Sequence, residues 1–191
     1  MRIVQGIWAD QRLISPGGRV RPTHEHVRNA WLSLLAPELS GARVLDLFAG
    51  SGALGLEALS RGAASADFVE NSGQALHALK ANIAQRKLRP PRRGQRPTQA
   101  HKSARVFKRD AIPFAARLDV GAYDIVFADP PYGSLKLDRI IERWMQVPFA
   151  PLLGVEHTPD HVVPDGVDRL EFEGSAVTIY RVTPEQLDVS R

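Results

Sequence analysis

A glycine-rich turn between an apolar strand and a helix is the feature that most constrains the fold of this chain. Residues 46–55 read DLFAGSGALG, and Gly50, Gly52 and Gly55 have the G-x-G-x-x-G spacing. Such glycines permit positive φ angles and let backbone N–H groups approach a ligand closely. A turn of this kind after a strand and before a helix predicts an α/β fold that binds a nucleotide-type cofactor.

Short apolar runs alternate with amphipathic helical patterns along the rest of the chain, which predicts a seven-stranded, mostly parallel sheet flanked by helices. Strands are expected at 43–48, 66–70, 105–108, 124–128, 152–156, 169–173 and 177–182. Helices are expected at 23–36, at 53–60, after Ser72 and at 135–145. Only Gly174 and Ser175 separate the last two strands, so we expect an antiparallel hairpin at one end of the sheet.

The length of 191 residues suits a single domain of this type. We expect three parts, namely an N-terminal β-hairpin extension, the α/β domain and a short C-terminal tail, at residues 1–22, 23–183 and 184–191. Strands at 2–9 and 12–15 would form the hairpin, and a basic loop at 86–104 would interrupt the domain.

The composition argues against membrane, redox and metal chemistry. No apolar stretch reaches the about 18 residues of a transmembrane helix, and the N-terminus lacks the apolar run of a signal peptide, so we expect a cytoplasmic protein. The chain contains no cysteine, which excludes disulfides and thiolate catalysis. Its six histidines show no paired metal-ligand spacing, and no metal site is expected.

Positive charge is concentrated in one part of the chain. The net charge is +4, yet residues 86–109 contain ten of the 25 Lys and Arg residues and no acidic residue, which leaves 15 basic against 21 acidic residues elsewhere. A basic patch on an acidic body fits a polyanionic partner, although a solvated loop without a partner fits equally well. A second basic group in and after the N-terminal extension includes Arg2, Arg12, Arg21 and Arg28.

Two carboxylates flank the glycine-rich turn. Glu70 ends the next predicted strand, where it can accept hydrogen bonds from both hydroxyls of a ribose. Asp46 stands at the mouth of the turn, where its charge would repel the pyrophosphate of a nicotinamide dinucleotide and attract the ammonium and sulfonium groups of S-adenosylmethionine. Asp110, after the third predicted strand, is an expected acceptor for the adenine amine. The predicted binding residues for S-adenosylmethionine are Asp46, Phe48, Ala49, Gly50, Ser51, Gly52, Glu70, Asp110, Ala111 and Asp129.

The tetrapeptide Asp129-Pro130-Pro131-Tyr132 follows an apolar strand, at the sheet edge where parallel α/β folds bind ligands. The two prolines fix the backbone, so the neighbouring acceptors are preorganised. The Asp129 carboxylate and the Pro130 carbonyl can accept the two N–H groups of an exocyclic base amine, and Tyr132 offers a ring on which a flipped base can stack. These four residues are predicted to be catalytic in methyl transfer to such an amine.

With these motifs placed, the chain resembles the RsmD family of 16S ribosomal RNA guanine-N2 methyltransferases. The resemblance is carried by RIVQG at 2–6, VRPT at 20–23, LDLFAGSGALGLEALSR at 45–61, FVE at 68–70, DPPY at 129–132 and VEH at 155–157. It implies a class I methyltransferase fold and methylation of a guanine amine in 16S ribosomal RNA, within assembled small-subunit particles. We further expect a monomer that contacts RNA through Arg2, Arg12, Arg21, Arg28, Arg92 and Arg93.

The chain departs from the family pattern in two places. Where the family usually shows RPTTDRVR, residues 21–28 read RPTHEHVR, so that His26 replaces an arginine. The Pro- and Arg-rich segment 88–103 is longer than the usual link at this point. Two other functions remain open: a DNA adenine or cytosine amino methyltransferase, since D-P-P-Y is shared with such enzymes, and a nicotinamide-dependent oxidoreductase.

Overall fold

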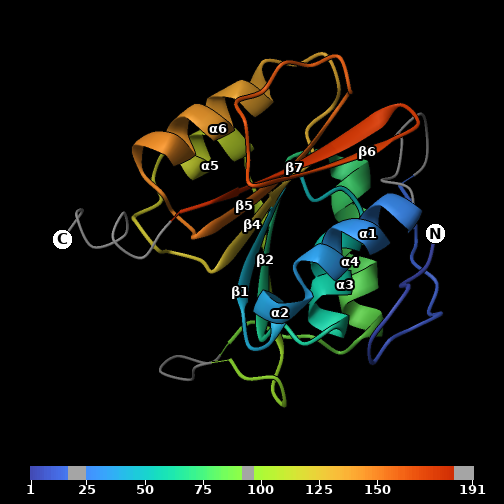
Figure 1. The fold of residues 1–191 in the computed structure, drawn as a ribbon. Coiled ribbons are helices and arrows are strands. Elements are labelled where there is room, and N and C mark those ends of the chain that lie inside the picture. The colour runs from blue at the N-terminus through green and yellow to red at the C-terminus, as the bar shows by residue number, and fades with distance from the viewer. Residues whose placement is uncertain (17–24, 92–96, 183–191) are drawn as a thin grey trace.

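In a computed structural model the chain forms a central sheet covered by helices on both faces (Figure 1). The structure describes residues 1–16, 25–91 and 97–182. The strands in these residues are β1 (Arg43–Leu47), β2 (Ser65–Glu70), β3 (Ser103–Lys108), β4 (Ile125–Ala128), β5 (Leu152–His157), β6 (Asp168–Phe172) and β7 (Ser175–Arg181). The helices are α1 (Glu25–Leu34), α2 (Ala36–Leu39), α3 (Ala53–Ser60), α4 (Gly73–Gln85), α5 (Ala111–Ala115) and α6 (Lys136–Gln146).

The seven strands lie in the order β3-β2-β1-β4-β5-β7-β6. β1 to β5 are parallel, and β7 runs antiparallel to both β5 and β6. The predicted fold class, including the antiparallel C-terminal hairpin, is confirmed. The order reverses between β1 and β4, which is the position where open α/β sheets bind ligands.

The register at this switch point brings the two predicted motifs together. Leu47 at the end of β1 pairs with Val69 of β2 on one side and with Ala128 of β4 on the other. The glycine-rich turn, Glu70 and Asp129 therefore leave the sheet next to one another at the carboxyl ends of their strands.

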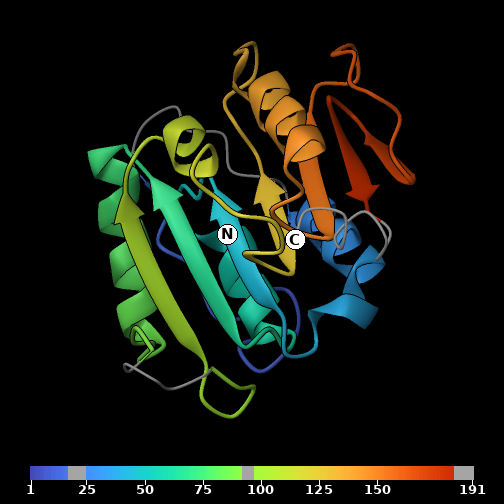
Figure 2. The same ribbon diagram turned by 90° about the vertical axis from the view of Figure 1, so that its left-hand side faces the viewer.

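Two apolar cores lie on the two faces of the sheet, and Figure 2 shows α5 and α6 on the face turned to the viewer. In the first core, helices α1, α2, α3 and α4 pack against one face of the sheet. Trp31 of α1 packs edge-on against Phe127 of β4 there, with ring centroids 5.3 Å apart. The second joins α5 and α6 to the opposite face, where Trp144 packs on Tyr180. Strand residues alternate between the cores, as the period of two in a β-strand requires.

Two short helices were not expected from the sequence. α2 has four residues and α5 has five, and both contain a proline, so neither shows an amphipathic repeat. α5 begins at Asp110, whose carboxylate accepts a hydrogen bond from the Ile112 backbone N–H at 2.9 Å and thus caps the helix. The expected first helix is described from Glu25 onward, and its predicted N-cap at Thr23 lies outside the described residues.

The N-terminal hairpin is shorter than expected. Arg2 and Arg12 form one antiparallel bridge, flanked by hydrogen bonds from Ile3 N to Gln11 O and from Leu13 N to Met1 O at 3.0 Å each. Turns occupy most of the chain between the two sides of the bridge. Ile3 and Leu13 are buried in the first core, so the hairpin is packed firmly on the domain.

A buried carboxylate also fastens this hairpin. Glu57 of α3 is fully buried and accepts hydrogen bonds from the backbone N–H groups of Val4 and Gln5. The same carboxylate pairs with the guanidinium groups of Arg28, at 3.2 Å, and Arg61, at 2.9 Å. Arg28 has 0% exposed surface, so the prediction that it binds RNA is wrong: its charge is used inside the protein.

No helix in the described part of the chain is long and apolar enough to cross a membrane. Within the same residues, no cluster of three or more His, Asp or Glu side chains is arranged to hold a metal ion.

Candidate active site

A cavity of about 520 Å³ opens at the carboxyl ends of β1, β2 and β4. This volume lies within the range of about 300 to 1,000 Å³ that is typical of small-molecule sites. The predicted residues that line the cavity are Asp46, Phe48, Ala49, Gly50, Ser51, Glu70, Asp129, Pro130, Pro131 and Tyr132. The structure thus brings the predicted cofactor turn and the predicted catalytic loop into one cavity.

The glycine-rich turn holds its shape through positive φ angles. Phe48, Gly50 and Gly52 have φ of 64°, 55° and 80°. A Cβ on Gly52 would lie 2.4 Å from Cδ1 of Leu79 in α4, so glycine is required there for packing as well as for conformation. Gly52 is a residue of the turn that supports the cavity from behind, since it is not among the cavity-lining residues.

Asp46 is buried at the end of β1, where its Oδ2 accepts a hydrogen bond from the Gly55 backbone N–H at 3.0 Å. Burial raises the pKa of Asp46, the hydrogen bond from Gly55 lowers it, and the negative charge of Glu70 raises it, with a net value of about 7. An ionised carboxylate is therefore costly at this position, and a cationic ligand in the cavity would stabilise it.

Glu70 ties the turn to the end of β2. Its Oε2 accepts from the Gly50 N–H at 2.8 Å, and its Oε1 accepts from the N–H groups of Asn71 and Ser72 at 2.8 and 2.7 Å. A carboxylate has about four acceptor sites, so these bonds leave room for a hydroxyl of a ligand. Glu70 therefore combines a structural contact to the turn with a lining position in the cavity.

Asp110 and Ala111 are placed differently from the other predicted cofactor residues. Both lie where β3 ends and α5 begins, and neither lines the cavity. The Asp110 carboxylate caps α5 and lies 3.9 Å from the ammonium of Lys136. Lys136 lines the cavity, and its ammonium lies 5.8 Å from the ring centroid of Phe48, so it extends over the cavity rim.

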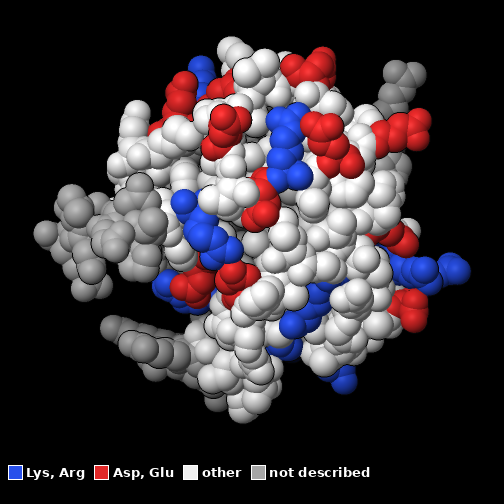
Figure 3. Space-filling view, viewed as in Figure 1, with Lys and Arg blue, Asp and Glu red and all other residues white. Residues whose placement is uncertain are grey.

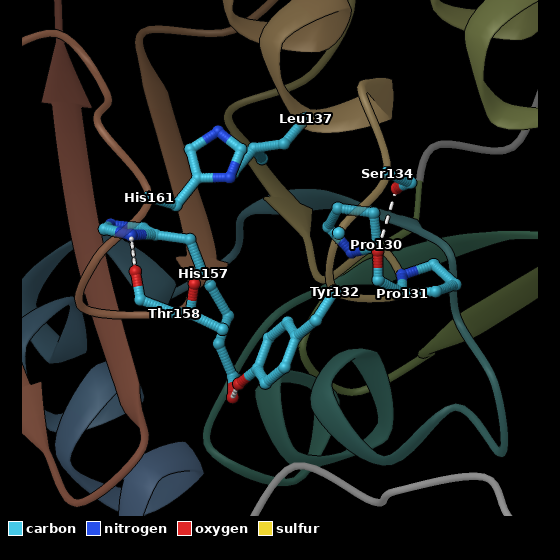
Figure 4. Close-up of a pocket in the computed structure, with 10 residues that line it drawn as sticks. Pro130, Pro131, Tyr132, Ser134, Leu137, His157, Thr158 and His161 are labelled. Carbon is cyan, nitrogen blue, oxygen red and sulfur yellow. Dashed lines mark hydrogen bonds between the residues drawn. The ribbon is translucent and has the colours of Figure 1, made fainter.

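The catalytic loop is held against β5. The Tyr132 hydroxyl donates a hydrogen bond to Oε1 of Glu156 at 2.9 Å, and the Ser134 hydroxyl donates to the Pro131 carbonyl at 2.8 Å. Figure 4 shows Tyr132 and the two prolines beside a narrow cleft of about 10 Å³, with His157 and His161 on its far side. Burial and the nearby carboxylate of Glu156 raise the pKa of Tyr132 to about 12, so its hydroxyl stays a donor at neutral pH.

Comparison with known proteins identifies the family of this chain. The family model described as "Conserved hypothetical protein 95" matches residues 1–149. The ribosomal RNA small subunit methyltransferase D of Escherichia coli is 39% identical over 144 residues, which cover 74% of this chain and 65% of that protein. The chain belongs to the RsmD methyltransferase family. YlbH of Bacillus subtilis is 31% identical over 177 residues, covering 89% of each chain.

Solved structures give the same result for the fold of this RsmD-family chain. The Escherichia coli protein yhhF is 33% identical with a TM-score of 0.76, and the match covers 95% of this chain and 97% of the other. The Thermus thermophilus 16S rRNA N2 G1207 methyltransferase RsmC, solved in complex with AdoMet and guanosine, is 18% identical with a TM-score of 0.61. That match covers 86% of this chain and 44% of RsmC and shows a shared class I methyltransferase fold.

Several residues of the RsmD-family site were not expected from the sequence. Met1, Ser15 and Pro16 of the N-terminal segment line the cavity together with Lys136 and Glu156. No local motif marks these residues, because each reaches the cavity only through the packing of a distant segment. The sole hint was the family-like VEH segment at 155–157, which contains Glu156.

The two predicted basic regions meet at Arg86, whose guanidinium donates a hydrogen bond to the Arg12 carbonyl at 3.4 Å and lies 5.8 Å from the ring centroid of Trp8. Arg2 and Arg12 are both exposed, and the segments that carry them reach the cavity at Met1 and at Ser15. The described ends of the basic loop bridge at Arg89 and Ser103, where β3 begins. β3 has six residues, so the loop starts about 20 Å from the cavity along the strand.

The remaining predicted RNA contacts are Arg21, Arg92 and Arg93, which lie outside the described residues, as does the departure at His24. His26 is exposed and its ring centroid lies 5.6 Å from that of Phe172. On the face seen in Figure 3, basic and acidic side chains of the described residues are interspersed. That face carries no continuous basic field in its described part.

Proposed function

We propose that this chain transfers the methyl group of S-adenosylmethionine to the N2 amine of a guanine in 16S ribosomal RNA. The observation that carries the proposal is the shared cavity, in which Asp46 and Glu70 face the catalytic loop 129–132. Relatives named ribosomal RNA small subunit methyltransferase D support the choice of ribosomal RNA. By the same resemblance, we propose a cytoplasmic monomer that acts on assembled small-subunit particles.

The donor set of the cavity fits S-adenosylmethionine. The cofactor supplies a methyl group on a positively charged sulfur and carries a second cation on its amino acid part. Asp46 offers a buried carboxylate for this positive charge, and Glu70 keeps one acceptor site for a ribose hydroxyl. Asp110 and Ala111 are proposed to bind the adenine part of the cofactor, next to Lys136 at the cavity rim.

The catalytic loop orients the amine that accepts the methyl group. The lone pair of a base amine is conjugated with the ring, so the nitrogen attacks well only when its two N–H groups are held and its lone pair points at the methyl carbon. Asp129 and the Pro130 carbonyl provide the two acceptors. One N–C bond forms as the C–S bond breaks, and the surplus proton on nitrogen passes to Asp129 and then to water.

Tritium transfer tests the proposal directly. Labelled S-adenosylmethionine is incubated with the protein and with small-subunit particles from cells that lack it, and the modified nucleotide is mapped by mass spectrometry. We expect one guanine to gain one methyl group on N2. Incorporation into DNA but not into these particles would make the chain a DNA amino methyltransferase instead.

The oxidoreductase alternative has one feature in its favour, since Tyr132 and Lys136 have the Tyr-x-x-x-Lys spacing of a hydride-transfer relay. Such a relay needs a phenol that releases its proton easily. The raised pKa of Tyr132 and the hydrogen bond from its hydroxyl to Glu156 have the opposite effect. Titration with NADH should therefore show no saturable binding to the cavity.

Asp46 should make cofactor binding depend on pH. Its carboxylate must be ionised to attract a cation, so the affinity for S-adenosylmethionine should rise by roughly eightfold between about pH 6 and pH 7.5 as Asp46 titrates. Asp46→Asn should bind more weakly and lose this dependence. Isothermal titration across this range checks both, and an equal slope in the variant would contradict the role of Asp46.

The same substitution should stabilise the protein without its cofactor. The pKa of Asp46 is raised in the folded state from 3.8 to about 7, so folding loses stability as pH rises through this interval. At about pH 8, Asp46→Asn should therefore be more stable by up to about 4 kcal/mol, and the gain should vanish below about pH 4. Urea unfolding at both pH values measures the difference.

Arg12 should contribute to RNA affinity because it is exposed and lies three residues before Ser15, which lines the cavity. Arg12→Ala should weaken binding to small-subunit RNA and make the slope of log K against log salt less steep by about 1. Arg117, exposed just after α5 on the opposite face, serves as the control for the same change. An unchanged slope for Arg12→Ala would mean that Arg12 does not contact the RNA. If the slope changes as expected, the same role is proposed for Arg2, Arg21, Arg92 and Arg93.

A further inference from the structure

Glu156 is a buried carboxylate at the inner wall of the cavity. It lies near the end of β5, is only 4% exposed, and lines the cavity together with Asp129 and Tyr132. Its Oε1 accepts two hydrogen bonds, from the Tyr132 hydroxyl at 2.9 Å and from the Ser175 hydroxyl at 2.8 Å. Its Oε2 is buried and has no hydrogen-bond partner among the described residues.

An acceptor without a donor is costly at such a depth, because burial removes the water that would otherwise solvate it. No ion pair of Glu156 with a cationic side chain is found in the described part of the chain. The neighbouring titratable groups are Asp129 and Lys136, which line the same cavity, and His157 and His161, which border the narrow cleft beside Glu156. The unsatisfied Oε2 of Glu156 therefore suits a ligand that presents an N–H donor to it.

We propose that Oε2 of Glu156 accepts the N1–H of the target base and so selects guanine. This inference rests on the proposed function and adds to it the residue that reads the base. Guanine carries an N1–H donor directly beside its N2 amine, so one edge of the base can meet Glu156 and Asp129 at the same time. The carboxylates would hold adjacent N–H groups, one for recognition and one for methyl transfer.

The other amine-bearing bases would be rejected at the same place. Adenine has an unprotonated N1 beside its amine, and cytosine has an unprotonated N3. Either ring nitrogen would bring a lone pair against a buried carboxylate, which leaves both acceptors without a donor. Selection thus depends on the protonation of one ring nitrogen and not on the amine.

The two hydrogen bonds to Oε1 hold the Glu156 carboxylate in one orientation. Tyr132 comes from the catalytic loop and Ser175 from the hairpin of β6 and β7, and both hold the same oxygen. The other oxygen is thereby kept in a fixed direction, as a preorganised acceptor must be. If Glu156 served only to connect the catalytic loop to β7, the two hydrogen bonds to its Oε1 would be sufficient, and Oε2 would have no role.

The inference is tested by replacing the target guanine with a base that keeps the amine at C2 but lacks the N1 proton. Once the methylated guanine is mapped, small-subunit particles are reconstituted with RNA that carries either guanine or 2-aminopurine at that position. 2-Aminopurine keeps the amine at C2 but has no proton on N1. The ratio of kcat/KM for the two substrates is measured for the wild-type protein, for Glu156→Gln and for Glu171→Gln, which makes the same change at an exposed carboxylate of β6.

We expect the wild-type protein to prefer guanine by about 100-fold or more. Glu156→Gln can present an amide N–H in place of Oε2, so its preference should fall below about tenfold, whereas Glu171→Gln should keep the wild-type ratio. Methylation of both substrates alike by the wild-type protein would overturn the inference, as would an unchanged ratio in Glu156→Gln. Failure of the wild-type protein to methylate guanine-containing particles would instead refute the proposed function.

Discussion

Replacing Asp129 with alanine is expected to lower kcat by about 10²- to 10⁴-fold while the affinity for S-adenosylmethionine changes little. The reason is that the partner of the Asp129 carboxylate in the proposed reaction is the amine of the base, whereas Asp46 and Glu70 provide the charges that face the cofactor. The kcat of Asp129→Asn should lie between those of the wild-type protein and Asp129→Ala, because the amide oxygen of asparagine can still accept one N–H but cannot take the proton.

Single-turnover methylation of small-subunit particles at saturating cofactor measures the effect, and equilibrium titration measures cofactor binding. Asp119, which is exposed beyond α5, gives a matched control for the loss of one carboxylate. If Asp129→Ala instead abolished cofactor binding and kept full turnover at saturation, Asp129 would belong to the cofactor site and the amine would need another acceptor.

Much of the fold follows from local sequence patterns. The apolar runs that become β1, β4 and β5 are continuous because both of their faces are buried, and their parallel pairing follows from the helices between them. The glycine-rich turn and the D-P-P-Y loop are also local motifs. Their meeting in one cavity follows from strand order alone, since both leave the sheet at its switch point.

The features that escaped prediction depend on contacts between distant segments. Glu156 looks like one more residue of a buried strand, and its role emerges only when the loop at Tyr132 and the hairpin at Ser175 close on it. Arg28 shows the reverse case. In the sequence it belongs to a group of arginines that were expected to be exposed. In the structure it is buried, because it forms an ion pair with Glu57 of α3, 29 residues later.

The pair of Glu57 and Arg28 also gives the largest expected effect on stability. Glu57→Ala removes the carboxylate that two guanidinium groups and two backbone N–H groups share, and it leaves the guanidinium of Arg28 buried without this negative charge. Breaking a buried ion pair from one side costs about 3 to 5 kcal/mol, because the remaining charge has no compensation. Glu171→Ala is the control, since its pair with Arg169 is exposed and should contribute no more than about 1 kcal/mol.

Urea unfolding measures both variants, and the cofactor affinity of Glu57→Ala provides a second readout. The N-terminal hairpin is fastened by Val4 and Gln5 to Glu57, and the same hairpin places Met1 in the cavity wall. Loss of the anchor should therefore weaken cofactor binding even where the domain remains folded. A variant that lost several kcal/mol of stability but kept its cofactor affinity would mean that the hairpin holds its place through Ile3 and Leu13 alone, and that the buried carboxylate serves only to neutralise Arg28 and Arg61.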